Sequence, residues 1–204
     1  MKRSILVLAL FFLVFSSRAQ LDYEILYKIN VENRPVQLDK SFQFISNSTG
    51  AIAVGVPLVL LGTGIFTHNQ ALLKQGTEAG ISFAVASVLS FGLKNTIRRT
   101  RPFDQHPDII KLSEGGGYSF PSGHTSDAFA LATSLALNNR KWYIIAPAYT
   151  WATLVAYSRL DLGVHYPSDV LGGIAVGVIS AYTARKINKW IHKEKHPNPT
   201  SMLY

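Results

Sequence analysis

The sequence has no cysteine and little charge. None of the 204 residues is cysteine, and only 16% of them are charged. The absence of cysteine excludes disulfides, thiolate metal sites, cysteine nucleophiles and lipoprotein attachment. The low charge, beside 48% hydrophobic residues, excludes a disordered chain, because such chains have too little apolar surface to offset conformational entropy. No repeat of fixed period is visible, so one folded domain is expected.

Acidic residues are scarce, with 12 Asp and Glu against 20 Lys and Arg, and the net charge is +8. This balance is typical of proteins that bind nucleic acid, an acidic membrane surface or an anionic substrate. Part of it belongs to the N-terminus, where Lys2 and Arg3 precede the apolar run 5–15 and small residues follow. The pattern predicts a signal peptide over residues 1–19, with a retained membrane anchor as the alternative. Either form directs the protein out of the cytoplasm.

The rest of the sequence predicts helices and no strands. Residues 20–49 are expected to form two short amphipathic helices, separated by Asn33-Arg34-Pro35. Uncharged apolar segments follow, without the alternation that strands require: 50–66, 79–93, 128–139, 142–158 and 170–184. The sequence therefore predicts an all-α helical bundle, with its core over residues 50–186 and a basic C-terminal tail over residues 187–204.

The five segments are rich in the small residues that let helices approach closely inside membranes. Their uncharged runs of 12 to 17 residues are shorter than the ~20 that a span prefers. The sequence therefore predicts five transmembrane helices, or six if the signal segment is retained. The alternative is a soluble helical periplasmic protein. With the mature N-terminus outside, five spans place Lys74, the turn 138–141 and the tail in the cytoplasm, which agrees with the positive-inside rule. The basic 94–120 connection then lies outside against that rule, which indicates a function for its cations. We expect a bacterial inner-membrane protein with this connection at the periplasmic face.

Three segments place basic and acid–base side chains beside helix ends. In the first, Lys94 and Arg101 are seven positions apart, so on a continuous helix they lie within ~20° of each other on one face. Pro102 then ends or redirects that helix. The second segment reads Ser-Phe-Pro-Ser-Gly-His-Thr at 119–125, directly before an apolar helix and after three glycines at 115–117. Exposed N–H groups at a helix N-terminus bind anions, and glycine allows close approach, so the second segment predicts an anion pocket.

The third segment contains Ser158-Arg159, then His165, then Asp169. Pro167 is expected to begin the final helix, which places Asp169 in its first turn, within reach of His165. A carboxylate there can hold Nδ1–H of the imidazole and leave Nε2 free as a nucleophile or base.

Together the three segments resemble the signature of the type 2 phosphatidic acid phosphatase (PAP2) superfamily, in its bacterial membrane lipid phosphatase branch. The resemblance covers roughly residues 22–190 and is carried by these positions: Lys94, Arg101, Pro102, Pro121, Ser122, Gly123, His124, Ser158, Arg159, His165 and Asp169. It implies an all-α fold in which the motifs converge at one end of a helical bundle.

The resemblance also implies roles. His165 attacks phosphorus to form a phosphohistidine, Asp169 orients its ring, and His124 protonates the leaving oxygen and then activates water. The implied phosphate-binding residues are Lys94, Arg101, Ser122, Gly123 and Arg159. Phosphoryl transfer spreads negative charge over the equatorial oxygens, so three cations and a helix N-terminus suit it, and no metal ion or other cofactor is expected.

The leading functional hypothesis is a phosphatase acting at the periplasmic face on a membrane lipid: lipid A phosphate, undecaprenyl pyrophosphate, phosphatidylglycerol phosphate or phosphatidic acid. The alternatives are a soluble periplasmic acid phosphatase of broad specificity, a vanadium haloperoxidase, and a non-catalytic protein that binds anionic lipid. A nucleic-acid partner is not expected, because no aromatic residues are interleaved with the basic ones for base stacking. Arg98 and Arg99 are not expected to be catalytic residues. We expect them to contact a second phosphate, an anionic headgroup, solvent or lipid.

Overall fold

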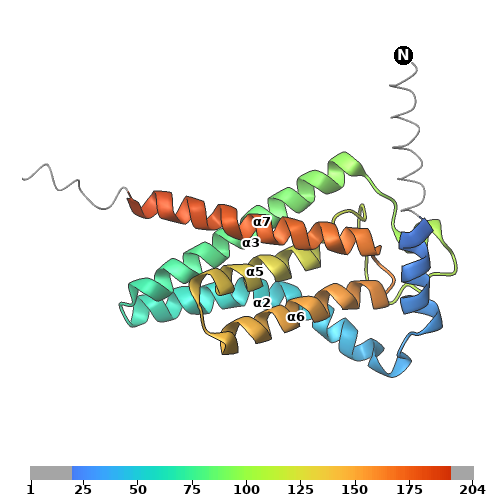
Figure 1. Ribbon diagram of the computed structural model, residues 1–204, viewed down its shortest axis with the longest axis horizontal. Helices are drawn as coiled ribbons and strands as arrows, with labels where there is room; N and C mark the ends of the chain where they lie inside the picture. Colours follow the sequence, from blue (N-terminus) through green and yellow to red (C-terminus); the bar gives the residue numbers. More distant parts are fainter. Residues whose placement is uncertain (1–19, 194–204) are drawn as a thin grey trace, which may run out of the picture.

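The computed structural model describes residues 20–193, and within this range it contains helices and no strand. Residues 20–27 are helical and continue into the π-helical turn η1 (Lys28–Glu32). The other elements, drawn in Figure 1, are η2 (Val36–Leu38), α2 (Asp39–Phe66), α3 (Gln70–Ile97), α4 (Pro102–Gln105), α5 (Gly123–Asn138), α6 (Trp142–Asp161) and α7 (Pro167–Lys193). The predicted all-α bundle is confirmed. The predicted signal segment 1–19 and the tail residues 194–204 lie outside the described range.

The long helices extend past the uncharged segments. The second predicted amphipathic helix and the segment 50–66 form one continuous helix, α2. Within it the hydroxyls of Ser48 and Thr49 donate to carbonyls three residues back, so these polar residues do not end the helix. Helices α3 and α7 likewise continue through charged residues such as Lys74 and Arg185. Lys and Arg are good helix formers, and uncharged length therefore underestimates helix length.

Three segments of the described chain are long and apolar enough to cross a membrane: Val36–Phe66, Gln70–Gln105 and Pro167–Ile191. Large apolar side chains on them, such as Val59 of α2 and Val88 of α3, are exposed. Helix α5 has 16 residues. At about 1.5 Å per residue its length is about 24 Å, less than the ~30 Å of a hydrocarbon core. The total of five spans therefore stays a prediction.

Glycines let α5 and α7 pack closely and in parallel. A Cβ added at Gly173 of α7 would lie 2.7 Å from the carbonyl oxygen of Ser122, and one at Gly177 would lie 2.5 Å from that of Ser126. The two glycines are one turn apart, and so are their neighbours on α5. The first turns of α5 and α7 therefore lie side by side at one end of the bundle.

The N-terminal helix lies across this same end of the bundle (Figure 1, blue). Its Leu26 is fully buried and packs against Ile109 and Tyr166. The buried amide of Asn30 donates to the carbonyl oxygens of Ile110 (3.0 Å) and Asp161 (2.7 Å) and accepts from the N–H of Ile110 (2.7 Å). The N-terminal helix is thus joined both to the loop after α4 and to the end of α6.

Candidate active site

The three predicted segments meet at this end of the bundle. Helices α3 and α6 end there, and α5 and α7 begin there. The N–H of Ser122 donates to the carbonyl oxygen of Asp169 (3.0 Å), which joins the second segment to the third. The ammonium group of Lys94 donates to the carbonyl oxygens of Tyr118 (2.7 Å) and Ser119 (3.3 Å), which joins the first segment to the second.

Lys94 and Arg101 do not share a helix face, so that prediction is wrong. Helix α3 ends at Ile97, and Arg98 (φ 52°) adopts the left-handed conformation while its N–H donates to the carbonyl of Lys94 (3.0 Å). Arg101 is extended, as the residue before a proline prefers, and Pro102 begins the short helix α4. The backbone reversal after α3, rather than helical periodicity, brings Arg101 to the site.

His165 lies at the centre of the site, in the turn between α6 and α7, and is 2% exposed. Its Nε2 lies 3.4 Å from Nη1 of Arg101, and its Nδ1 lies 3.6 Å from Oδ2 of Asp169. Burial lowers the pKa of His165 to about 3, with further lowering by the charges of Arg159 and Arg101 and an opposing effect of Asp169. The imidazole is therefore neutral at pH 7, and one ring nitrogen carries a lone pair for attack on phosphorus.

Asp169 is fully buried in the first turn of α7, as predicted. Its Oδ2 accepts from the hydroxyl of Ser119 (2.5 Å) and the N–H of Tyr166 (2.9 Å), and its Oδ1 accepts from Nη1 of Arg99 (2.8 Å). These bonds favour the ionised carboxylate and fix its plane. At 3.6 Å its contact with the neutral ring of His165 is longer than a hydrogen bond, and catalytic contacts of this kind often tighten when substrate binds. The geometry suits the orienting role that the family resemblance implies.

Arg101 is 5% exposed and holds the glycine loop that precedes α5. Its guanidinium donates to the carbonyl oxygens of Gly116 (2.9 Å), Gly117 (3.0 Å) and Val164 (2.9 Å). A Cβ at Gly115 would lie 2.9 Å from Nη1 of Arg101, so a larger residue there would require the guanidinium or the loop to shift. Arginine has five N–H groups, and the second one on Nη1 lies on the side of Nε2 of His165, so one N–H on Nη2 is free for a phosphate.

Arg159, on the last turn of α6, is 2% exposed. Its Nη1 donates to the hydroxyl of Ser46 on α2, and its Nε is buried without a hydrogen-bond partner among the described residues. An unmatched buried N–H of a charged group is costly, so this guanidinium is suited to an anionic ligand.

His124 is the second residue of α5 and lies outside the three candidate spans. Burial, and then the charges of Arg159, Arg101 and Lys94, lower the pKa of His124 to about 4. All three predicted cations are therefore close enough to His124 to disfavour its charged form. A phosphate bound among them opposes this field, and we expect it to raise the pKa of His124 towards the range of a general acid.

The N-terminus of α5 is open towards this space. A Cβ built on Gly123 would meet no atom within 4 Å. Ser122, the N-cap residue, is fully buried and its hydroxyl accepts from that of Thr125 (2.9 Å). The first N–H groups of a helix have no partner within the helix, so an anion at Gly123 can accept from them.

Sequence reasoning missed three residues that surround Asp169: Asp22, Arg99 and Ser119. Ser119 is the first residue of the second segment, but its hydroxyl donates to Asp169 only because the loop brings it there. The sequence predicts contact of Arg99 with a second phosphate, an anionic headgroup, solvent or lipid, whereas in the structure Arg99 forms ion pairs with Asp169 and with Asp22. Asp22 carried no local signal, because its partners lie far away in the sequence.

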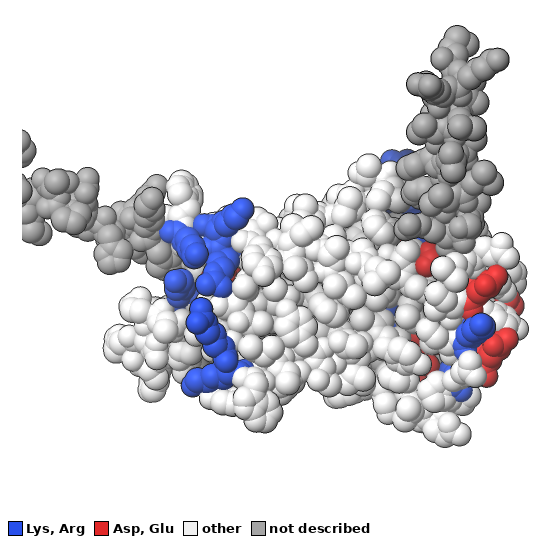
Figure 2. Space-filling model, viewed as in Figure 1, with Lys and Arg blue, Asp and Glu red and all other residues white. Residues whose placement is uncertain are grey.

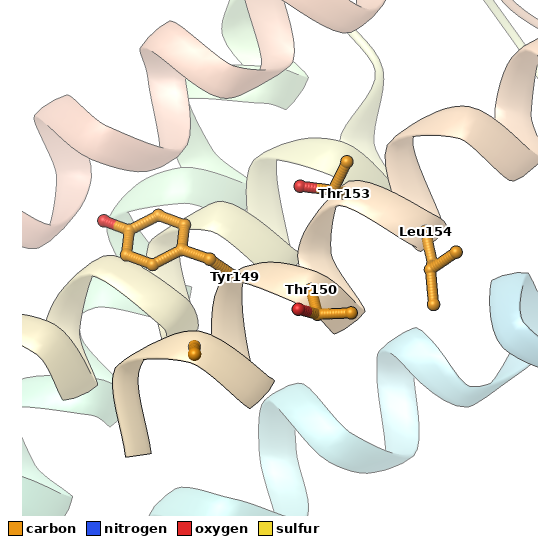
Figure 3. Close-up of a pocket in the computed structure, with 5 residues that line it drawn as sticks. Tyr149, Thr150, Thr153 and Leu154 are labelled. Atoms are coloured by element: carbon orange, nitrogen blue, oxygen red, sulfur yellow. The ribbon is translucent and has the colours of Figure 1, made fainter. Parts of the chain in front are cut away.

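A separate open hollow of about 380 Å³ lies along the middle of α6, lined by Ala146, Tyr149, Thr150, Thr153 and Leu154 (Figure 3). None of these five side chains is charged, and none belongs to the three predicted segments. Within residues 20–193 no cluster of three or more His, Cys, Asp or Glu could hold a metal ion. The site's chemistry rests on the histidines, the buried aspartate and the cations described above.

Residues 75–193 match the PAP2 superfamily. The undecaprenyl-diphosphatase BcrC of Bacillus subtilis is 31% identical over 163 residues, which cover 79% of this chain and 81% of that protein. A lipid A 4'-phosphatase of Bacteroides thetaiotaomicron is 36% identical over 103 residues, which cover 48% of this chain and 45% of that protein. The crystal structure of a transmembrane PAP2-type phosphatidylglycerolphosphate phosphatase from Bacillus subtilis aligns with a TM-score of 0.70 at 25% identity, over 91% of this chain and 96% of that chain. The long apolar helices and these relatives agree on a membrane protein and a phosphatase, and the chain belongs to the PAP2 superfamily.

Proposed function

We propose that the protein removes phosphate from a membrane lipid at the periplasmic face, through a phosphohistidine on His165. The observation that carries the proposal is the neutral, buried imidazole of His165, whose Nε2 lies 3.4 Å from the Arg101 guanidinium while Asp169 lies on its Nδ1 side. A guanidinium beside the attacking nitrogen stabilises the charge on the phosphoryl oxygens. A carboxylate on the far side stabilises the imidazolium that forms as the nitrogen attacks.

The reaction proceeds in two displacements. His124 takes up a proton when the phosphate of the substrate binds and raises the pKa of its ring. Nε2 of His165 forms a bond to phosphorus as the bond from phosphorus to the leaving oxygen breaks, and His124 gives that proton to the leaving oxygen. His124 then takes a proton from water, whose oxygen attacks phosphorus and breaks the phosphorus–nitrogen bond. When phosphate leaves, the pKa of His124 falls again, its proton is released to solvent, and both histidines return to their starting states. Arg101, Arg159 and the N-terminus of α5 hold the equatorial oxygens throughout.

The charge distribution supports a periplasmic site. Basic residues gather at the end of the bundle away from the site, where Figure 2 shows a blue cluster: Lys74, Arg140, Lys141, Arg185, Lys186 and Lys189. Two hydrogen bonds join these helix ends. Arg185 of α7 donates to the carbonyl oxygen of Leu137 on α5 (2.8 Å), and Asn188 of α7 donates to that of Lys74 on α3 (3.2 Å). By the positive-inside rule this end belongs in the cytoplasm, which leaves the catalytic end outside.

Apolar surface beside the site supports a lipid substrate. Phe91, almost one turn before Lys94 on α3, is 72% exposed, and Leu171, two residues after Asp169 on α7, is 66% exposed. A substrate with its chains in the bilayer can therefore contact apolar side chains while its phosphate reaches the cations. The relatives' names include undecaprenyl diphosphate, lipid A and phosphatidylglycerolphosphate as substrates, and all three carry a phosphate on a lipid. Lipid A and the undecaprenyl carrier, as envelope lipids, are the first candidates.

The test is phosphate release by the purified protein in detergent, with lipid A, undecaprenyl pyrophosphate, phosphatidylglycerol phosphate, phosphatidic acid and p-nitrophenyl phosphate as substrates. We expect at least one lipid to be hydrolysed faster than the soluble ester, and His165→Ala to abolish release from both. Release from the soluble ester alone would favour the broad-specificity phosphatase. Unchanged turnover in His165→Ala would refute the nucleophile. Alkaline extraction of membranes is a second test, because an integral protein is retained and a soluble or peripheral one is released.

A further inference from the structure

The N-terminal helix is connected to the buried carboxylate of the site through one arginine. Nη2 of Arg99 donates to Oδ2 of Asp22 (2.9 Å), and Nη1 donates to Oδ1 of Asp169 (2.8 Å) and to the hydroxyl of Ser168 (2.5 Å). Oδ1 of Asp22 also accepts the N–H of Ser168 (2.9 Å), so an aspartate from another helix caps the first turn of α7. The guanidinium carbon of Arg99 lies 4.0 Å from the centre of the Tyr166 ring. Two carboxylates and an aromatic face therefore hold this guanidinium.

The two oxygens of Asp169 are divided between two tasks. Oδ2 faces His165 and accepts from Ser119 and the backbone of Tyr166, while Oδ1 is bound by Arg99. Without Arg99 the carboxylate loses its bond at Oδ1, and only the two bonds at Oδ2 oppose rotation about its Cβ–Cγ axis. It also loses the cation that compensates a fully buried charge on the side away from His165.

We propose that Arg99 is a positioning residue for the phosphatase reaction, and that Asp22 on the N-terminal helix holds Arg99 in place. The inference rests on the proposed function of His165 and Asp169 and adds that the N-terminal helix is part of the catalytic unit. Arg99 touches neither the substrate nor the attacking nitrogen; it acts through Asp169. The packing of Leu26 and the hydrogen bonds of Asn30 fix the helix that carries Asp22.

The alternative is that Arg99 binds a second phosphate or a headgroup. The two roles predict different kinetics. A binding role raises KM and leaves kcat almost unchanged, whereas a positioning role lowers kcat and leaves KM almost unchanged. Since a misplacement of about 1 Å can cost about 100-fold, we expect Arg99→Gln to lower kcat about 10- to 100-fold. Asp22→Asn should lower kcat less, because Arg99 keeps its bond to Asp169.

Matched controls exist beside each residue. Arg98 is exposed and donates from Nε to the carbonyl of Asn95 (2.9 Å), away from Asp169. Arg98→Gln therefore makes the same chemical change one position away, and we expect kcat within twofold of the wild type. Glu24 is exposed on the same helix as Asp22. We expect Glu24→Gln, the control for Asp22→Asn, also to keep kcat within twofold of the wild type. Thermal unfolding of every variant shows whether a loss of kcat reflects loss of the fold.

The deciding experiment combines steady-state kinetics on p-nitrophenyl phosphate with binding of orthovanadate and of inorganic phosphate, measured by calorimetry. Vanadate mimics the transition state, so Arg99→Gln should weaken vanadate binding at least about 10-fold and phosphate binding less than about threefold. Asp22→Asn combined with Arg99→Gln should lower kcat by less than the product of the two single effects, because part of the effect of Asp22 passes through Arg99 and the Asn side chain can still accept the N–H of Ser168. Rescue of part of kcat by Arg99→Lys would support the role of the charge.

Three results would overturn the inference: a loss confined to KM, equal weakening of vanadate and phosphate, or additive effects of the two substitutions. These outcomes are distinct from failure of the proposed function. If no lipid is hydrolysed, the soluble ester still reports on Arg99. If the wild type hydrolyses nothing, the proposed function fails while the difference between vanadate and phosphate binding still tests the positioning role.

Discussion

The contact between α5 and α7 at Gly173 offers a quantitative test of how the fold positions the site. In Gly173→Ala the new Cβ would lie 2.7 Å from the carbonyl oxygen of Ser122 and 2.9 Å from Cβ of Thr125. Ordinary contact begins at 3.4 Å, so the first turn of α5 must move by about 0.7 Å. Ser122 is the N-cap of the helix that carries His124, and the movement displaces that histidine from the cations.

Both activity and stability should respond. If about 1 Å of misplacement costs about 100-fold, a shift of this size should lower kcat about 10- to 50-fold. Overpacking costs about 1–3 kcal/mol, and replacing a helical glycine by alanine contributes about 0.5–1 kcal/mol of stability, so the net loss of stability should be no more than about 2.5 kcal/mol. The assay is kcat on p-nitrophenyl phosphate together with the midpoint of thermal unfolding.

Gly62→Ala on α2 is the matched control, because a Cβ there meets no atom within 4 Å. This variant should keep wild-type kcat and unfold at the same or a higher temperature. If Gly173→Ala unfolds at a lower temperature but retains kcat within twofold, the close crossing of α5 and α7 does not position His124, and the reasoning is refuted.

Further predictions concern pH, anion access and the buried arginine. An unfolded histidine titrates near 6.5 and His124 near 4, so the unfolded state binds more protons between these values and stability falls as pH is lowered through that range; at pH 4 the loss from this residue is about 3 kcal/mol. Thermal unfolding of His124→Gln should show a flatter pH dependence, and identical slopes would contradict the burial of a neutral ring. Gly123→Val should leave the unfolding midpoint within a few degrees but raise KM at least about 10-fold, because its side chain fills the open space before α5; an unchanged KM would contradict anion approach there. Ser46→Ala should cost about 1–3 kcal/mol by leaving Nη1 of Arg159 unmatched, with partial recovery in inorganic phosphate. A midpoint equal to the wild type would show that this hydrogen bond carries no stability.

Several features of the fold and site were predictable because they depend on local chemistry. Apolar runs without strand alternation predicted the helices, and Pro167 predicted the start of α7, which places Asp169 in its first turn. The motif residues converge as the family resemblance implies. The helix lengths were underestimated, because a charged residue within a helix does not end it.

Other features could not be predicted because they depend on contacts between distant segments. The left-handed backbone at Arg98 ends α3 before Arg101. The sequence has no glycine at this position, which would have predicted such a conformation. The partners of Arg99 lie on the N-terminal helix and on α7, so its sequence neighbours carry no information about them.

By itself the sequence determined the all-α class, the family and the chemical identity of the reacting groups, since these follow from periodicity and from side-chain type at fixed spacing. Tertiary structure alone decided which donors of Arg101 are left for a phosphate, which oxygen of Asp169 faces His165, and that Asp22 reaches the site. The physical reason is that each buried polar group must find its partner wherever packing brings one, and that position is a property of the whole bundle.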